Sequence, residues 1–441
     1  MSEIESFELS VHWPEGISPG EQDAGEISLR VNQEILTRLA DVRNEKTRTF
    51  LRGSAVSLGL WIAENWWRLR YEPYPLTLVP PTDWRLRHEL TSVSGGTTWP
   101  PIMIYGEGTR IIVAPRFGIT DVDGPVRYLN TPVVSVEGKA YEKGIDTFFT
   151  EVLQKCSQAS DADALHALVK ELTEERADDA TVSWRRLEAM LGYDADRAPE
   201  ALITAMQKFE KQIGLQAVEE CAVSAPGFEA ALNIKRAVSA VLNSRIVVDL
   251  GVARKLKSYQ SRLSPTTEPW RLAESAAQEV RQKIGIPKGP ILSSNLADVL
   301  QITKDRIKEA HSTAANLPYG AVGTAKQTRE KSQIALQAKT TSGRRFEIAR
   351  ALGDAAWDSH AKFAPVSRAK STRQKFQRTF AQSFLCPFPD LIEYMGTTNP
   401  ADRDVIAAAK HFHVSENVIR TLLVNKEIIP RERLEDRLEA A

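Results

Sequence analysis

The chain has 441 residues, of which 42% are hydrophobic and 26% charged, and its 57 Lys and Arg balance its 57 Asp and Glu. This composition is typical of a soluble globular protein of two or three domains and excludes disordered and fibrous classes. A net charge of zero also argues against a protein that coats nucleic acid without sequence specificity.

Targeting signals and cysteine usage point to the cytoplasm. The opening residues MSEIESFELS lack the basic and then apolar pattern of a signal peptide, and no run of about 18 apolar residues follows. The three cysteines are far apart and form no disulfide framework: Cys156, Cys221 and Cys386. We therefore expect a cytoplasmic protein that spans no membrane.

Residues 1–150 predict a tryptophan-rich domain of mixed α and β structure, since six of the nine tryptophans lie there. Apolar residues four apart, from Ile27 to Leu39, predict a helix over 27–44. Four more elements are predicted in chain order: a helix over 51–70, a hairpin over 102–114 around a Gly-Glu-Gly turn, a strand over 132–138 and a helix over 141–156.

Residues 151–275 predict a helical middle region, and residues 276–441 predict a mainly helical C-terminal domain. Within the middle region, 184–192 reads as a short helix closed by glycine, and prolines 265 and 269 mark a break. The predicted fold is therefore α+β, in three parts.

The stretch 304–378 carries sixteen Lys and Arg against six Asp and Glu, which makes it about ten charges positive. Such a stretch can contact phosphate groups of nucleic acid. A solvated face and a surface for an acidic protein partner are equally good interpretations.

Three segments near the C-terminus stand out by their order and spacing. They are RRFEIARALGD at 344–354, RQKFQRTFAQSFLCP at 373–387 and AAAKHFHVSENVIRTLLVN at 407–425. Together they resemble the ImmA/IrrE-type metallopeptidase family, whose pattern runs R-F-[ST]-x-A-H-E-x-x-H, then F-A-x-x-L-L-x-P, then F-x-V-S. The resemblance covers about the last 110 residues and implies a zincin-like fold and proteolytic control of repressors, tied to mobile elements and stress.

This chain departs from that pattern at the positions that bind zinc and supply the general base. In H-E-x-x-H, two histidines on one helix face bind Zn²⁺ and the glutamate acts as general base. Here Arg350 stands at the first histidine, Ala351 at the glutamate and Asp354 at the second histidine, while Gln374 falls near the third-ligand carboxylate. Arginine has no lone pair to donate to zinc. The resemblance therefore implies a degenerate former active site with no catalytic residue, no metal and no cofactor.

Arg350 and Asp354 are four residues apart on the predicted helix. They can pair across one turn, an interaction worth about 0.2–0.5 kcal/mol on an exposed face. One hypothesis is that this pair fills the space of the metal, and the alternative is that both side chains face solvent.

The histidines do not rebuild a metal site by pattern. His88 and Glu89 begin like H-E-x-x-H, but position 92 is serine. His411 and His413 are two apart at the end of a predicted helix, which is poor ligand spacing. Surface or capping positions are the favoured interpretation for these side chains.

Cys386 ends an apolar helix stripe with a spacing of four, and His360 is the one nearby base in sequence. Packing of a buried cysteine is favoured over a nucleophile. The aromatic stretch 61–70 likewise predicts a core rather than a ligand site.

The residue pattern of the segment 407–425 predicts a helix-turn-helix with Ser415 as the cap of the second helix, and the segment 296–308 has a similar pattern. A DNA-reading helix projects basic and amide side chains into the major groove. The second helix offers Arg420 and two asparagines, and we favour a scaffold role over DNA reading.

The leading functional prediction is a non-catalytic regulator that recognises another protein, whose identity does not follow from the sequence. One alternative is a DNA-associated transcriptional regulator that uses the basic C-terminal domain. A second alternative is a hydrolase with a rebuilt active site. The oligomeric state and the pathway do not follow from the sequence.

Overall fold

The computed structural model is an α+β protein whose chain falls into two units, unit 1 (residues 1–205) and unit 2 (residues 206–441). The helical region predicted over 151–275 is thus shared between the two units. The structure describes residues 5–14, 23–77, 79–116, 126–129, 132–225, 227–263, 268–309, 317–324, 331–397 and 399–430.

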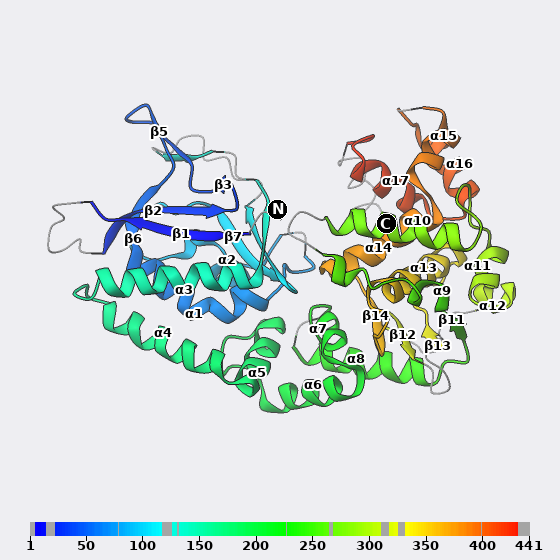
Figure 1. Ribbon diagram of the computed structural model, residues 1–441, viewed down its shortest axis with the longest axis horizontal. Coiled ribbons are helices and arrows are strands. Elements are labelled where there is room, and N and C mark those ends of the chain that lie inside the picture. Colours follow the sequence, from blue (N-terminus) through cyan, green and yellow to red (C-terminus); the bar gives the residue numbers. More distant parts are fainter. Residues whose placement is uncertain are drawn as a thin grey trace. The chain divides into compact units, whose positions relative to one another are not determined.

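Unit 1 contains short antiparallel strands and long helices (Figure 1). Its strands are β1 Phe7–His12, β2 Ala24–Val31, β3 Glu34–Ile35, β4 Leu39–Asp41, β5 Lys46–Arg48, β6 Leu51–Ser54, β7 Ile102–Glu107, β8 Arg110–Pro115, β9 Val126–Tyr128 and β10 Val134–Glu137. Its helices are α1 Ala55–Tyr71, α2 Thr82–His88, α3 Gly138–Lys155, α4 Ala162–Ala177 and α5 Asp179–Met190, and α6 Glu200–Ile213 runs across the unit boundary.

The helix predicted over 27–44 is wrong, because this stretch forms β2, β3 and β4. A spacing of four is even, so it satisfies the period of a strand as well as that of a helix. Leu29 is buried between Ile27 and Val31, which fits alternation and not a helical face. A tight turn at Asn32, with φ of 54°, then pairs β2 with β3.

Most other predictions for unit 1 are confirmed. The hairpin is β7 and β8, and the last strand and helix are β10 and α3. The stretch 51–70 begins as strand β6, and α1 starts where the Ser54 hydroxyl accepts from the Ser57 amide and so caps the helix. The aromatic stretch on α1 is core, as predicted: Trp61, Trp66 and Trp67 are buried.

Unit 2 places helices around one four-stranded antiparallel sheet of order β11-β13-β12-β14. Its strands are β11 Val247–Asp249, β12 Gly320–Thr324, β13 Lys331–Ala335 and β14 Phe363–Val366. Its helices are α7 Leu215–Ala222, α8 Gly227–Leu242, α9 Gly251–Arg254, α10 Pro269–Lys283, α11 Ser293–Val299, α12 Lys304–Glu309, α13 Thr341–Trp357, α14 Thr372–Leu385, α15 Phe388–Met395, α16 Asp402–Phe412 and α17 Glu416–Asn425.

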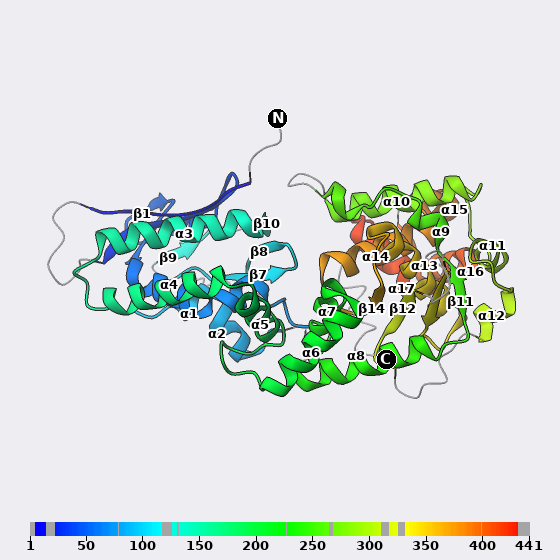
Figure 2. The same cartoon turned by 60° about the horizontal axis from the view of Figure 1, so that its bottom comes forward.

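Helices α13 and α14 form the centre of unit 2 and lie side by side in both ribbon views (Figures 1 and 2). The predicted stripe on α14 is fully buried: Phe376, Phe380 and Phe384. Gly353 of α13 faces this stripe, and a Cβ atom there would lie 2.9 Å from Cβ of Phe380. The glycine therefore lets the two helices approach closely.

In the part of the chain that the structure describes, no helix is both long enough and apolar enough to cross a bilayer.

Candidate functional site

The four residues predicted at the former active site lie on α13 and α14. Arg350, Ala351 and Asp354 are on α13, and Gln374 is in the first turn of α14. All are buried, and the most exposed of them, Arg350, retains 7% of its surface. The interpretation that Arg350 and Asp354 face solvent is therefore wrong.

Arg350 is held by neutral oxygen atoms. Its Nη2 donates to Oε1 of Gln374 at 2.5 Å, to the Ser367 carbonyl at 2.7 Å and to Oε1 of Gln377 at 3.2 Å. Its Nε is buried and has no hydrogen-bond partner among the described residues. Burial, together with the charge of Arg378, lowers the pKa of Arg350 to about 9.

Asp354 pairs with Arg373 of α14, and not with Arg350. Nε and Nη2 of Arg373 donate to the two carboxylate oxygens at 2.6 and 2.8 Å, and Nε2 of Gln377 donates to Oδ1 at 2.7 Å. Burial alone would lower the pKa of Arg373, but the charge of Asp354 and the bonds to it outweigh burial and raise that pKa. The predicted pair across one helical turn is therefore replaced by a pair between helices.

The two glutamines also fasten the edge strand β14 to α14. Nε2 of Gln374 and Nε2 of Gln377 both donate to the Pro365 carbonyl, at 2.9 and 3.2 Å. The Ser367 amide donates to Oε1 of Gln374 at 3.0 Å. We call the set of side chains that joins these elements the α13–α14 network: Arg350, Asp354, Ser367, Arg373, Gln374 and Gln377.

Zinc does not fit the α13–α14 network. The guanidinium of Arg350 offers no lone pair, and both Asp354 oxygens already accept from Arg373. Ala351 adds only a methyl group in the core of the unit. Among the residues that the structure describes, no three His, Cys, Asp or Glu side chains are grouped so that they could hold a metal ion.

One acidic side chain from α7 reaches the start of α14. Ser371 caps α14 by accepting from the Gln374 amide at 3.2 Å, and its hydroxyl donates to Oε2 of Glu220 at 2.6 Å. Burial raises the pKa of Glu220, although the charge of Arg373 opposes the shift. This carboxyl is thus more easily protonated than one in water.

His411 and His413 occupy the predicted surface and capping positions. His411 is exposed and stacks on Tyr394, with ring centroids 4.1 Å apart. His413 is the C-cap residue of α16, with φ of 53°. Burial, with the charges of Arg345 and other cations, lowers the pKa of His413.

The cysteine alternative has no geometric support. Cys386 is fully buried, and burial raises the pKa of its thiol. His360 is exposed on the segment after α13. The packing interpretation of Cys386 is confirmed.

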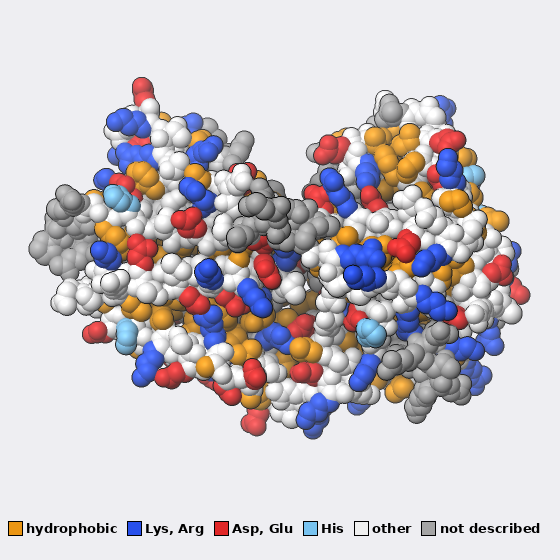
Figure 3. Space-filling model, in the orientation of Figure 1, with side chains coloured by type: hydrophobic (Ala, Val, Ile, Leu, Met, Phe, Trp, Pro, Cys, Tyr) orange, Lys and Arg blue, Asp and Glu red, His pale blue; other side chains and the backbone are white. Residues whose placement is uncertain are grey.

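The predicted helix-turn-helix pattern of 407–425 is confirmed: it forms α16 and α17, and the Ser415 hydroxyl accepts from the Val418 amide. Arg420 is buried, however, and donates to Oδ1 of Asp402 at 2.9 Å. On the face shown in Figure 3, Lys and Arg side chains are spread over the surface together with Asp and Glu side chains. Several cations of the stretch 304–378, in contrast, are interior. The buried ones are Arg344, Arg345, Arg350 and Arg373.

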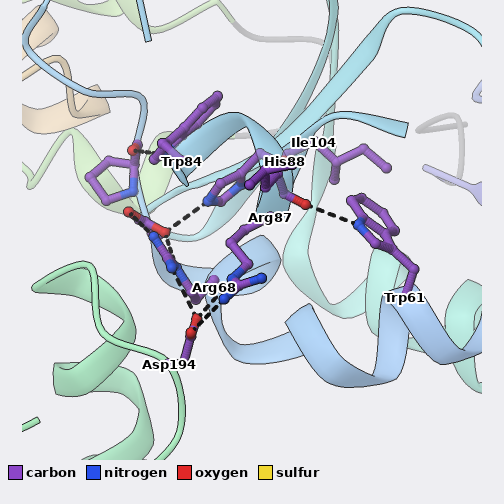
Figure 4. A network of polar contacts seen from close by, with 10 residues as sticks. Trp61, Arg68, Trp84, Arg87, His88, Ile104 and Asp194 are labelled. Carbon is purple, nitrogen blue, oxygen red and sulfur yellow. Dashed lines mark hydrogen bonds and ion pairs between the residues drawn. The ribbon is translucent and has the colours of Figure 1, made fainter. Parts of the chain in front are cut away.

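A second buried polar network, in unit 1, centres on His88 (Figure 4). His88 is fully buried, which corrects its predicted surface position. Its Nδ1 lies 2.7 Å from the Ile104 carbonyl, and its Nε2 lies 2.8 Å from Oε2 of Glu72. The Ile104 carbonyl can only accept, so Nδ1 donates to it.

Two arginines extend this network to the loop after α5. Arg68 donates to both oxygens of Glu72, at 2.5 and 3.0 Å, and to Asp194 at 2.9 Å, while Arg87 donates to Asp194 at 2.7 Å. Burial opposes ionisation of Glu72, but the charge of His88 and the bonds from Arg68 outweigh it and lower the pKa of Glu72. We call Arg68, Glu72, Arg87, His88 and Asp194 the His88 network.

The His88 network has a structural role. Both ring nitrogens of His88 are engaged, so neither is available as a general base. The bonds join α1, α2, β7 and the loop that follows α5. The sequence alone does not predict that these residues interact, because they are spread from residue 68 to residue 194.

Comparisons of the chain with protein-family models, with curated proteins and with solved structures found no match.

Proposed function

We propose that this chain is a non-catalytic relative of the ImmA/IrrE-type metallopeptidases and acts by binding another protein. The proposal rests on the motifs at 344–354, 373–387 and 407–425 and on one observation of geometry. The residues that the resemblance assigns to the metal-ligand positions lie between α13 and α14, where Arg350 donates to Gln374 and Asp354 accepts from Arg373 and Gln377.

This arrangement supports binding without catalysis. A metallopeptidase needs three protein ligands, an open fourth position and a general base. The α13–α14 network supplies two guanidinium groups, two amides, a hydroxyl and a carboxylate that is already paired with one of the guanidinium groups. On this proposal, the helices and the sheet around the network serve as the support for a binding surface.

Metal analysis of the full chain tests the non-catalytic part of the proposal. We expect protein purified without chelator, incubated with zinc and passed through gel filtration to retain far less than one zinc per chain. We also expect no cleavage of casein with or without added zinc. One tightly held zinc together with cleavage that a chelator stops would overturn the proposal.

A further inference from the structure

Unit 2 contains a cleft of about 530 Å³, a volume within the range of about 300–1,000 Å³ that ligand sites occupy. Its lining comes from the end of α6, the C-terminal half of α8, the strands β12 and β13, and the segment 359–363. Arg254 of α9 lines it as well, and the same side chain lines a small neighbouring cavity together with Ala351 and Asp354. The cleft is therefore adjacent to the α13–α14 network.

The positive charges of this cleft are compensated by groups around it. Nη2 of Arg254 donates to Oγ of Ser332 at 2.8 Å. The charges of Asp354 and Asp249 also act on that guanidinium. Lys362 is exposed and has an interaction of its own. The small neighbouring cavity is lined by two cations and two acids, namely Arg254, Lys362, Asp354 and Asp358. The described lining therefore favours no ionic ligand, since its charges already have partners.

The inner part of the lining is apolar. Four aliphatic or aromatic side chains of the cleft are each no more than 8% exposed: Ile213, Val238, Val241 and Phe363. Such side chains lie away from the opening, because solvent hardly reaches them. Leu242 of α8 also lines the cleft but is 54% exposed, so it lies at the rim. A ligand that fills the cleft is stabilised by moving an apolar body out of water.

Three polar side chains of the lining have unused hydrogen-bonding capacity. Those of Gln212, Ser359 and His360 are half-buried or exposed, and they form no hydrogen bond within the part of the chain that the structure describes. The backbone amide of His360 donates to Oδ1 of Asp358 at 2.9 Å, which leaves the imidazole available. An amide, a hydroxyl and a neutral imidazole each donate and accept without charge. They suit the uncharged polar groups of a ligand.

We propose that this cleft binds a small uncharged organic molecule with an apolar body and one or two hydrogen-bonding groups. The body contacts the buried apolar side chains, such as Val241 and Phe363. The polar groups exchange hydrogen bonds with the side chains that have capacity to spare, such as Ser359 and His360. This ligand site goes beyond the proposed protein-binding function and does not rest on it.

Two fluorescent probes with the same ring framework test the class of ligand. Phenylnaphthylamine is uncharged, and anilinonaphthalene sulfonate adds an anionic group to the same rings. Both become brighter in apolar surroundings, so titration of the full chain gives the Kd and the stoichiometry of each. We expect saturable binding of phenylnaphthylamine at one site per chain, at least about tenfold tighter than binding of the sulfonate, which would have to lose its hydration without gaining a free cation.

Variants of exposed residues locate the bound probe. Leu242→Glu places a carboxylate at the rim of the cleft and should weaken binding of phenylnaphthylamine at least about tenfold. Leu232→Glu is the matched control, because Leu232 is 45% exposed on the same helix and does not line the cleft. It should leave the affinity within about twofold. Ser359→Trp fills the cleft with an indole instead of a charge and should also weaken binding, and thermal unfolding checks that each variant is folded.

Three results would overturn this assignment. Equal or tighter binding of the sulfonate would refute the uncharged class of ligand. Absence of saturable binding of either probe would refute the cleft as a ligand site. Equal losses in Leu232→Glu and Leu242→Glu would place the probe on the exposed surface of α8 and not in the cleft. None of these results depends on zinc content or on a protein partner, so the proposed function would stand or fall separately.

Discussion

Arg373 lies in the interior of unit 2 with Asp354 as the carboxylate that pairs with it directly. We expect Asp354→Ala to lower the free energy of unfolding by about 3–5 kcal/mol, because it leaves a buried cation without its counter-charge. Urea unfolding of the full chain measures the loss. The double variant Asp354→Ala/Arg373→Met removes both charges and should recover part of the stability, and no recovery would contradict this account.

Glu220 makes stability depend on pH. Burial raises its pKa above the ordinary value of 4.5, so folding favours the protonated form. Its contribution is fully present below about pH 4.5 and is lost as pH rises through the folded-state pKa. We therefore expect Glu220→Gln to raise the melting temperature at pH 7 and to lose this advantage at pH 4.

Glu229→Gln is the control for that experiment, because Glu229 is exposed on α8. Its melting temperature should follow that of the unchanged protein at both pH values. An advantage of Glu220→Gln that persisted at pH 4 would show that protonation is not the cause.

The ring nitrogen of His88 that donates can be observed directly. The Ile104 carbonyl can only accept, so we expect ¹⁵N spectra of labelled protein to show a proton on Nδ1 of His88. The exposed His166 provides the comparison within the same chain. A His88 ring without a proton on Nδ1 would contradict the hydrogen bond to Ile104.

Sequence reasoning located some residues of the candidate site and missed others for a physical reason. Arg350 and Gln374 were found because the resemblance to the family pattern points to these positions, and they are in contact. Arg373 was missed as the partner of Asp354, because a pair between two helices depends on how the helices cross. His88 was assigned to the surface, since its partners are distant in sequence.

At the scale of elements, the crossing of α13 and α14 depends on Gly353. Alanine there would favour the helix by about 0.5–1 kcal/mol, but its Cβ would overlap Phe380 and overpacking costs about 1–3 kcal/mol. We expect Gly353→Ala to destabilise the protein by about 1–2 kcal/mol in urea unfolding. Gln278→Ala, on the exposed face of α10, should change stability by less than about 0.5 kcal/mol.

Elements were predicted correctly where the spacing of apolar residues and the turn or cap residues fit only one kind of secondary structure. The hairpin of β7 and β8 follows from two β-rich runs around a turn, and α16 and α17 follow from their cap and spacing. The prediction for 27–44 was wrong because a spacing of four between apolar residues fits both a helix and a strand. Pairing of β2 with β1 and β6 stabilises the strand. That pairing joins residues far apart in sequence.

At the scale of the whole molecule, the described residues form two hydrophobic cores, one in each unit. Chains of this kind depart from two-state unfolding. We expect calorimetry of the full chain to resolve two transitions and Asp354→Ala to lower only the one that belongs to unit 2. A single transition that shifts as a whole would show that the units unfold together.

The pairing within the α13–α14 network also bears on how such a site changes over evolutionary time. On the proposed ancestry, a return to zinc binding would have to pass through single substitutions. Histidine at position 354 alone would leave the Arg373 guanidinium without its paired carboxylate, and histidine at 350 alone would remove the Arg350 donor from Oε1 of Gln377. On that ancestry, each first step costs stability before any metal is gained, so the loss of the metal site would be difficult to reverse.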